Sequence, residues 1–141
     1  MAQSSKPSVL FVCVKNGGKS QMAAGLMHQL AGDAVDVHSA GTKPGPAIND
    51  LSAQALLEVG VDITDQQPKP VDLELARDVD LVVTLGREAQ LDPLPGTRLE
   101  NWETDEPSER GIDGIERMRL VRDDIAQRVR SLLDDLNVAT N

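Results

Sequence analysis

The chain has 141 residues, a length that suits one domain and allows a proper hydrophobic core. Hydrophobic residues make up 40 % and charged residues 26 % of the chain, as is usual in soluble globular proteins. A net charge of −9 argues against partners that require a basic face, so we expect neither nucleic acid nor an anionic membrane surface. The single cysteine excludes an internal disulfide, and no apolar run approaches the roughly 18 residues of a membrane span. We therefore expect a cytoplasmic protein.

The first third of the sequence predicts a tail, a strand, a helix and a second strand. Residues 1–7 are polar and short, and we expect a flexible tail there. Residues 9–12 are continuously apolar, which is typical of a strand covered on both faces. Apolar residues at helical spacing then predict a helix from Ser20 that ends at Gly32. Alternating apolar residues predict a second strand over 34–40.

The central segment begins with a proline-bearing loop and continues with two predicted helices. Asn49 is a suitable N-cap for a helix that Gly60 would end. A polar connection follows, and residues 73–77 predict a short helix.

The last part of the sequence predicts two more strands and a long helix. Residues 79–85 form the second clearly buried strand, and 87–91 predict a helical turn. Residues 98–102 are semi-apolar and indicate an edge strand. An apolar stripe at spacings of three and four predicts an amphipathic helix over 115–136.

The alternation of strands and helices predicts an α/β fold with three layers. A four-stranded parallel sheet would be flanked by helices on both faces, because crossover connections place helices there. We find no repeat and no boundary, so residues 1–141 are predicted to form a single domain.

Cys13 ends the first predicted strand and begins a loop that runs into the first predicted helix. N–H groups at a helix N-terminus, together with the helix dipole, make such a loop a binding site for an oxyanion. A lone cysteine is often an inert core residue, but nearby lysines and the dipole favour the nucleophilic thiolate. We therefore predict thiol chemistry on a phosphate-like anion. The anion would be held by the backbone of Val14, Lys15, Asn16, Gly17, Gly18, Lys19 and Ser20.

A nucleotide-binding loop is the rival interpretation of the same segment. Residues 13–20 differ from the pattern G-x-x-x-x-G-K-[ST] only by cysteine in place of the first glycine. Such enzymes hold magnesium with an aspartate at the end of a second buried strand. That strand here ends Thr84-Leu85-Gly86 without an aspartate, which argues against the nucleotide interpretation.

Several segments together resemble the low-molecular-weight protein tyrosine phosphatase superfamily and, within it, the arsenate reductases built on the same fold. The resemblance covers nearly the whole chain and rests on Val-Leu-Phe-Val-Cys13 with Lys19-Ser20-Gln21-Met22-Ala23, on Ser39-Ala-Gly-Thr42-Lys-Pro, on Val-Val-Thr84-Leu85, and on Trp102 shortly before an acidic residue and proline. It implies that Cys13 is the nucleophile and that Asn16 keeps the loop in shape. It also implies that Ser20 stabilises the thiolate and that Ser39 bonds to the loop from the neighbouring strand.

Two positions depart from the phosphatase pattern. Lys19 stands where the family usually has arginine, and lysine cannot make the two-pronged guanidinium contact to an oxyanion. The general acid of the phosphatases is an aspartate directly before proline, whereas Glu106 precedes Pro107 here. Asp105 is adjacent, so either Asp105 or Glu106 could supply the proton. The chain has no tyrosine to line a phosphotyrosine groove.

The cysteine count narrows the resemblance further. Thioredoxin-coupled arsenate reductases on this fold carry two more cysteines after the third strand, and one of them would fall at Gly86. Cys13 alone cannot form a disulfide relay, so an external thiol is required. The single-cysteine, mycothiol-dependent reductases share the Asn-Gly-Gly-Lys-Ser loop and the later Glu116-Arg117-Met118-Arg119 segment.

This resemblance implies an arsenate–mycothiol transferase. Its substrates would be arsenate, with phosphate as a competitor, and mycothiol as co-substrate. Mycoredoxin would act downstream on the adduct, and no bound cofactor or metal is expected. A low-molecular-weight tyrosine or phosphomonoester phosphatase is the first alternative, and a non-catalytic oxyanion-binding relative is the second.

The remaining polar residues are interpreted as structural. His28 and His38 have no cysteine or histidine neighbours at metal-ligand spacing. The charges of the last helix, Arg117 among them, are predicted to form its solvated face, with docking of a redox partner as the other possibility.

Overall fold

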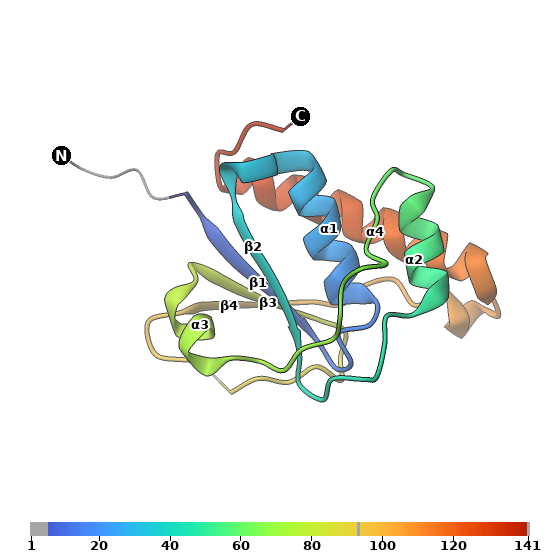
Figure 1. Ribbon diagram of the computed structural model, residues 1–141, viewed down its shortest axis with the longest axis horizontal. Helices are drawn as coiled ribbons and strands as arrows, with labels where there is room; N and C mark the ends of the chain where they lie inside the picture. Colours follow the sequence, from blue (N-terminus) through green and yellow to red (C-terminus); the bar gives the residue numbers. More distant parts are fainter. Residues whose placement is uncertain (1–5, 93, 141) are drawn as a thin grey trace.

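The computed structural model describes residues 6–92 and 94–140. Their strands form one parallel sheet in the order β2-β1-β3-β4, which confirms the predicted architecture (Figure 1). The strands are β1 Ser8–Cys13, β2 Asp36–Gly41, β3 Leu81–Leu85 and β4 Arg98–Trp102. The predicted N-terminal tail falls mostly on residues 1–5, outside the described residues.

The described part of the chain also contains four α-helices and two 3₁₀ turns, of which α4 and the second turn follow the last strand. The helices are α1 Lys19–Ala31, α2 Asp50–Leu57, α3 Leu73–Asp78 and α4 Gly114–Asp135. The turns are Gly32–Ala34 and Pro107–Arg110. Asn49 caps α2 as predicted, because its side chain accepts a hydrogen bond from the Ser52 N–H. None of these helices is both long and apolar enough to span a bilayer.

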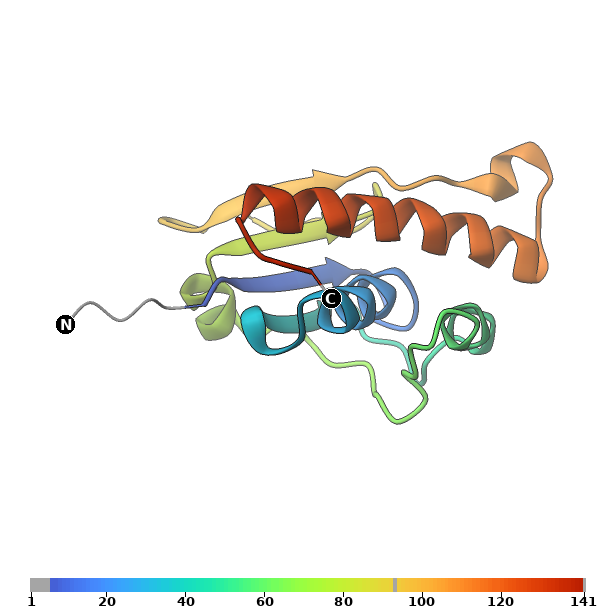
Figure 2. The ribbon, with the colours of Figure 1, turned by 90° about the horizontal axis from the view of Figure 1, so that it is seen from above.

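Side chains alternate between two hydrophobic cores along the central strands. Val9, Phe11 and Cys13 face the layer formed by α1, α2 and α4. Leu10 and Val12 point to the opposite face, where α3 covers the sheet (Figure 1). Seen from above in Figure 2, α4 runs along the sheet beside α1. Both faces of β1 are therefore buried, as its continuous apolar sequence predicts.

Two strand starts and one predicted helical turn differ from the sequence-based predictions. β2 begins at Asp36 rather than at residue 34, because Gly32–Ala34 form a 3₁₀ turn after α1. β3 begins at Leu81 because Val79 caps α3. The predicted helical turn over 87–91 is wrong. Gly86 has a φ of +92° and its carbonyl accepts from the Asn101 side chain, so the chain stays along the sheet edge.

The order of the strands places one edge of the sheet at a topological switch point. β1 and β3 are neighbours, yet the chain leaves β1 toward β2 and leaves β3 toward β4. Crevices at the carboxyl ends of such strands are the usual ligand sites of open α/β sheets. The loop after Cys13 and the loop beginning at Gly86 meet here, since a Cβ on Gly86 would lie 3.6 Å from the Lys19 Nζ.

An ion-pair cluster ties α2 to α4 beside this edge. Glu58, at the end of α2, accepts two hydrogen bonds from the Arg119 Nε and another from its Nη2, and it also accepts one from Arg122. Arg122 additionally donates to the backbone carbonyl of Ala55. Hydrogen bonds from Arg119 and Arg122 lower the pKa of Glu58 to about 2.

We expect the Glu58 cluster to make folding stability pH-dependent in the acid range. A carboxylate whose pKa is lowered on folding stabilises the fold above its ordinary pKa of 4.5 and loses that contribution as the pH falls toward 2. Glu58→Gln should therefore unfold at lower urea concentration near neutral pH and show a flatter decline in acid. Glu74→Gln, an exposed change on α3, serves as the control and should behave like the parent. A Glu58→Gln profile parallel to the parent's from neutral to acid pH would contradict this expectation.

Candidate active site

The loop from Cys13 to Gly18 is shaped by hydrogen bonds that hold its carbonyl groups outward. Backbone N–H groups in the segment 42–49 donate to four of these carbonyls. The bonds are Thr42 N to Cys13 O at 3.0 Å, Lys43 N to Val14 O at 2.8 Å, Gly45 N to Lys15 O at 2.9 Å, and Asn49 N to Gly17 O at 2.8 Å. Because a peptide group points its N–H opposite to its C=O, the loop turns its N–H groups toward its concave side.

These N–H groups lie where the sequence predicts an oxyanion cradle. Within residues 6–92 and 94–140, no protein acceptor takes the backbone N–H of Val14, Lys15, Gly17 or Gly18. The first turn of α1 continues the row, since its earliest helical bond is Met22 N to Gly18 O. N–H groups without a protein acceptor at a helix N-terminus attract anions, so this row indicates an anion site at the N-terminus of α1.

Gly41, the last residue of β2, lies directly against the loop. A Cβ on Gly41 would come within 2.6 Å of the Val14 carbonyl oxygen and 3.0 Å of the Asn16 backbone N. No real side chain fits there without displacing the loop. The close approach explains why glycine ends β2 and makes Gly41 a residue that positions the cradle.

The Asn16 side chain is oriented by a backbone donor. The Lys69 N–H donates to the Asn16 Oδ1 at 3.0 Å, and the Gln21 Nε2 donates to the same oxygen at 3.1 Å. A backbone N–H can only donate, so the side-chain oxygen of Asn16 must face Lys69. The Asn16 Nδ2 then faces the loop interior and donates to the Ser20 Oγ at 2.7 Å. Asn16 itself has a φ of +54°, a left-handed conformation that asparagine tolerates well.

This chain of hydrogen bonds ends at the sulfur of Cys13. Because the Ser20 Oγ accepts from Asn16, its own proton is available to donate to the Cys13 Sγ, which lies 2.9 Å away. The Asn16 backbone N–H also donates to the sulfur, at 3.2 Å. Two donors directed at one sulfur stabilise a thiolate, as expected for a nucleophilic cysteine. Cys13, Asn16 and Ser20 thus lie together as predicted.

Ser39 does not make the contact that the resemblance implied. It is buried on β2, with its Cα paired in register with that of Phe11. Within the described residues, however, no hydrogen bond joins its side chain to the loop. Lys69 and Gln21 hold the loop from outside instead.

Cys13 opens into a cavity of about 380 Å³ whose charged lining is entirely cationic. The cations are Lys15, Lys19 and Arg117, and no carboxylate among the described residues lines this cavity. Its apolar lining includes Met22, Pro46, Met118 and Val121. The prediction that Arg117 belongs to the solvated face of the last helix is therefore wrong, since it reaches this cavity from α4.

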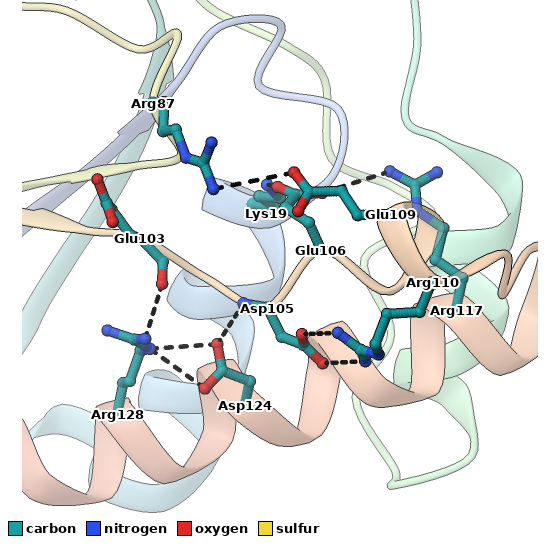
Figure 3. A network of polar contacts seen from close by, with 10 residues as sticks. All are labelled: Lys19, Arg87, Glu103, Asp105, Glu106, Glu109, Arg110, Arg117, Asp124 and Arg128. Atoms are coloured by element: carbon teal, nitrogen blue, oxygen red, sulfur yellow. Dashed lines mark hydrogen bonds and ion pairs between the residues drawn. The ribbon is translucent and has the colours of Figure 1, made fainter.

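The two acidic candidates are separated by the structure. Glu106 forms an ion pair and hydrogen bond with Lys19, at the rim of the cavity (Figure 3). Asp105 points the other way and receives two hydrogen bonds from Arg110, at 2.8 and 3.1 Å. The Arg110 guanidinium holds the pKa of Asp105 below its usual range, which disfavours the protonated form of an acid catalyst. Of the two, only Glu106 contacts the loop.

Four residues that matter to the site were not assigned to it from the sequence: Gly41, Gln21, Lys69 and Arg117. Gly41 and Gln21 fall in segments that carry the family resemblance, so the motifs contain a signal for them. Lys69 contributes a backbone group, which no residue pattern reveals. In the described part of the chain, no three histidine, cysteine or acidic side chains gather as a metal site would require.

A model of the low-molecular-weight phosphotyrosine protein phosphatase family matches residues 8–141. The chain therefore belongs to this family, as its loop and fold indicate.

Arsenate reductases are among its relatives in that family. The arsenate reductase of Halalkalibacterium halodurans is 34 % identical over 135 residues, which cover 92 % of this chain and 96 % of the relative. The arsenate reductase of Bacillus subtilis is 34 % identical over 134 residues, covering 89 % and 94 %.

Solved structures of arsenate reductases superpose on this chain. A thioredoxin-dependent arsenate reductase of Corynebacterium glutamicum superposes with a TM-score of 0.79 and 35 % identity over 96 % of this chain, which spans 64 % of the length of that protein. An arsenate reductase in the phosphate-binding state gives a TM-score of 0.80 at 30 % identity, covering 92 % of this chain and 98 % of that one.

Gly41→Ala should impair anion binding with little loss of fold. The added methyl group would press on the Val14 carbonyl and the Asn16 backbone, and the N–H row would move with them. We expect inorganic phosphate to bind at least about tenfold more weakly, as measured by calorimetry. Gly45→Ala is the matched control, because its Cβ would make only an ordinary contact with Lys15 at 3.5 Å. Equal phosphate affinity in the two variants would refute the role of Gly41.

Ser20→Ala should slow alkylation of Cys13 by iodoacetamide near neutral pH. The substitution removes one of the two donors to the sulfur, and hydrogen bonds to charged groups are worth about 1.5–3 kcal/mol, so a decrease of about tenfold is expected. Ser52→Ala removes another buried hydroxyl of the same cavity, one that donates to Asn49 and does not contact the Cys13 sulfur. That control should react at the parent's rate, and a Ser20→Ala rate equal to it would show that the hydroxyl does not support the thiolate.

Proposed function

We propose that the protein is an arsenate reductase that works as an arsenate–mycothiol transferase in the cytoplasm. The observation that carries the proposal is the position of Cys13. The only cysteine of the chain receives two hydrogen bonds at the floor of a cavity with cationic side chains and unpaired N–H groups. Such a site suits a tetrahedral oxyanion next to a thiolate. The arsenate reductases among its relatives support arsenate as that oxyanion, and a relative's phosphate-binding state supports phosphate as a competitor.

The need for an external thiol follows from the cysteine count. With Cys13 alone, no second sulfur of the chain can form a disulfide after arsenic is reduced. The cavity volume of about 380 Å³ lies within the range of small-molecule sites. Its apolar side, with Met118 and Val121, offers a surface for a thiol next to the anion. The Asn-Gly-Gly-Lys-Ser loop and the Glu-Arg-Met-Arg segment, which resemble the mycothiol-dependent reductases, support mycothiol as that thiol.

The proposed reaction balances without a bound cofactor. The mycothiol thiolate forms a bond to arsenic, and one arsenate oxygen leaves as water after protonation. Glu106 is the proposed proton donor because, of the two acidic candidates, it is the one beside Lys19. The adduct still contains As(V). A mycoredoxin thiolate then attacks the mycothiol sulfur, a mixed disulfide forms, and arsenic leaves with the electron pair as arsenite. The balance is the same whether Cys13 bonds arsenic first or assists from beside it.

A phosphatase is the competing function, because the family is named for that activity. Phosphotyrosine hydrolysis needs an acid for the leaving phenol and a groove for its ring. No aromatic side chain from the described residues lines the Cys13 cavity, and the residue before Pro107 is glutamate rather than aspartate. These features favour a small inorganic anion over phosphotyrosine.

The test is turnover with purified components. Arsenate, mycothiol, mycoredoxin and its reductase should together support steady NADPH consumption, and Cys13→Ser should abolish it. Omitting mycothiol, or replacing mycothiol and mycoredoxin with thioredoxin and its reductase, should leave only background consumption.

Three results would contradict the proposal in different ways. Turnover with thioredoxin and its reductase, without mycothiol and mycoredoxin, would show that thioredoxin is the reductant. Rapid hydrolysis of para-nitrophenyl phosphate without arsenate reduction would identify a phosphatase. Arsenate binding without either activity would identify a non-catalytic relative.

A further inference from the structure

We propose that Arg117 on α4 binds the oxyanion above Cys13 through its guanidinium group, and that Glu106 is the counter-ion of this site while the cavity is empty. The inference rests on the proposed function only for the identity of the anion. The roles of Arg117 and Glu106 rest on the positions of the cations around the cavity.

Among the described residues that line the cavity, Arg117 is the cation that comes from outside the loop region. Lys15 and Lys19 belong to the loop and the first residue of α1, whereas Arg117 reaches the same cavity from the first turns of α4. A second cavity next to it, at the Glu106 side, is also lined by both Lys19 and Arg117. Arg117 therefore lines both cavities, and its guanidinium faces Glu106 (Figure 3).

The Arg117 side chain has an unused hydrogen-bonding group. Its Nε is buried and has no hydrogen-bond partner within the described residues. Its Nη2 lies 3.9 Å from the Glu106 Oε2, which is an ion pair but too long for a hydrogen bond. A buried N–H without an acceptor costs free energy, so an unpaired guanidinium N–H next to an anion site indicates a ligand that completes it.

Three other arginines of α4 already have hydrogen-bond partners. Arg119 donates to Glu58 at 2.6–3.1 Å, and Arg122 donates to Glu58, to Asp123 and to a backbone carbonyl. Arg128 donates to Asp124 and to the Glu103 carbonyl. Arg117 differs from these three because no carboxylate saturates it. The site needs such a group, since Lys19 is a point charge already paired with Glu106 and lacks a planar fork.

Glu106 is positioned to exchange with an incoming anion. One of its oxygens contacts Lys19 and the other faces Arg117, so a single carboxylate neutralises two cations of the site. An oxyanion in the cavity would compete with Glu106 for both. Glu106 therefore opposes anion binding, and removal of the Glu106 charge should strengthen the binding of the anion.

The test measures binding of inorganic phosphate to the full-length protein by calorimetry and by protection of Cys13 from iodoacetamide. Arg117→Ala should weaken phosphate binding by about tenfold or more, as expected for loss of a charge-assisted hydrogen bond. Arg117→Lys keeps the charge without the fork and should fall between Arg117→Ala and the parent. Glu106→Gln should bind phosphate several-fold more tightly than the parent, by about the effect of one nearby charge.

Arg130→Ala is the matched control. It removes the same charge from the exposed end of the same helix, about 20 Å away along its axis. Its phosphate affinity should equal that of the parent. If Arg117→Ala does not fold, as judged by circular dichroism, the less disruptive Arg117→Lys decides the matter.

Phosphate affinity of Arg117→Ala within twofold of the parent's would overturn the role of Arg117. Weaker binding by Glu106→Gln would overturn the counter-ion role. Because the probe is phosphate binding, these outcomes are separate from turnover. A protein that binds phosphate through Arg117 but does not reduce arsenate would refute the proposed function and leave this inference standing.

Discussion

The active site depends on hydrogen bonds that turn the carbonyl groups of one loop outward. The segment 42–49, which follows β2, donates to four carbonyls between Cys13 and Gly17. The anion cradle is therefore a property of two adjacent strands rather than of the loop sequence alone. The packing of β2 against β1 fixes where the segment begins, and Gly41 allows it to approach closely enough. Preorganised donors of this kind need no rearrangement when charge arrives, which is what catalysis on an oxyanion requires.

Net charge says little about a site of this size. The chain carries a formal charge of −9, yet the charged side chains that line the Cys13 cavity in the described part of the chain are cations. The acidic residues lie at the rim and beyond, where Glu106 pairs with Lys19 and Asp105 pairs with Arg110. Backbone dipoles supply the remainder of the positive potential, because N–H groups and a helix N-terminus attract anions without any basic residue. A protein can thus be acidic overall and selective for anions at one point.

The sequence was sufficient to predict the fold and to place Cys13, Asn16 and Ser20 together in one loop. Buried strands, helix caps and the order of elements were predictable because they depend on local patterns, and Cys13, Asn16 and Ser20 lie in one short segment. The two wrong predictions about the site, for Ser39 and Arg117, have a common cause. The contact assigned to Ser39 is made by Lys69 and Gln21, and Arg117 enters from a helix a hundred residues later in the chain. Such contacts depend on tertiary packing, which the sequence pattern of one helix face does not report.

The hydrogen bond from Lys69 to Asn16 uses the backbone of Lys69, so mutation of the side chain at position 69 does not remove it. Its donor is a peptide N–H between Pro68 and Pro70, which have none, and the Lys69 carbonyl accepts in turn from the Gly41 N–H. Any residue except proline can provide both groups. The fold therefore makes its demand on the peptide unit at position 69 and not on the side chain, so any substitution other than proline should leave both hydrogen bonds in place.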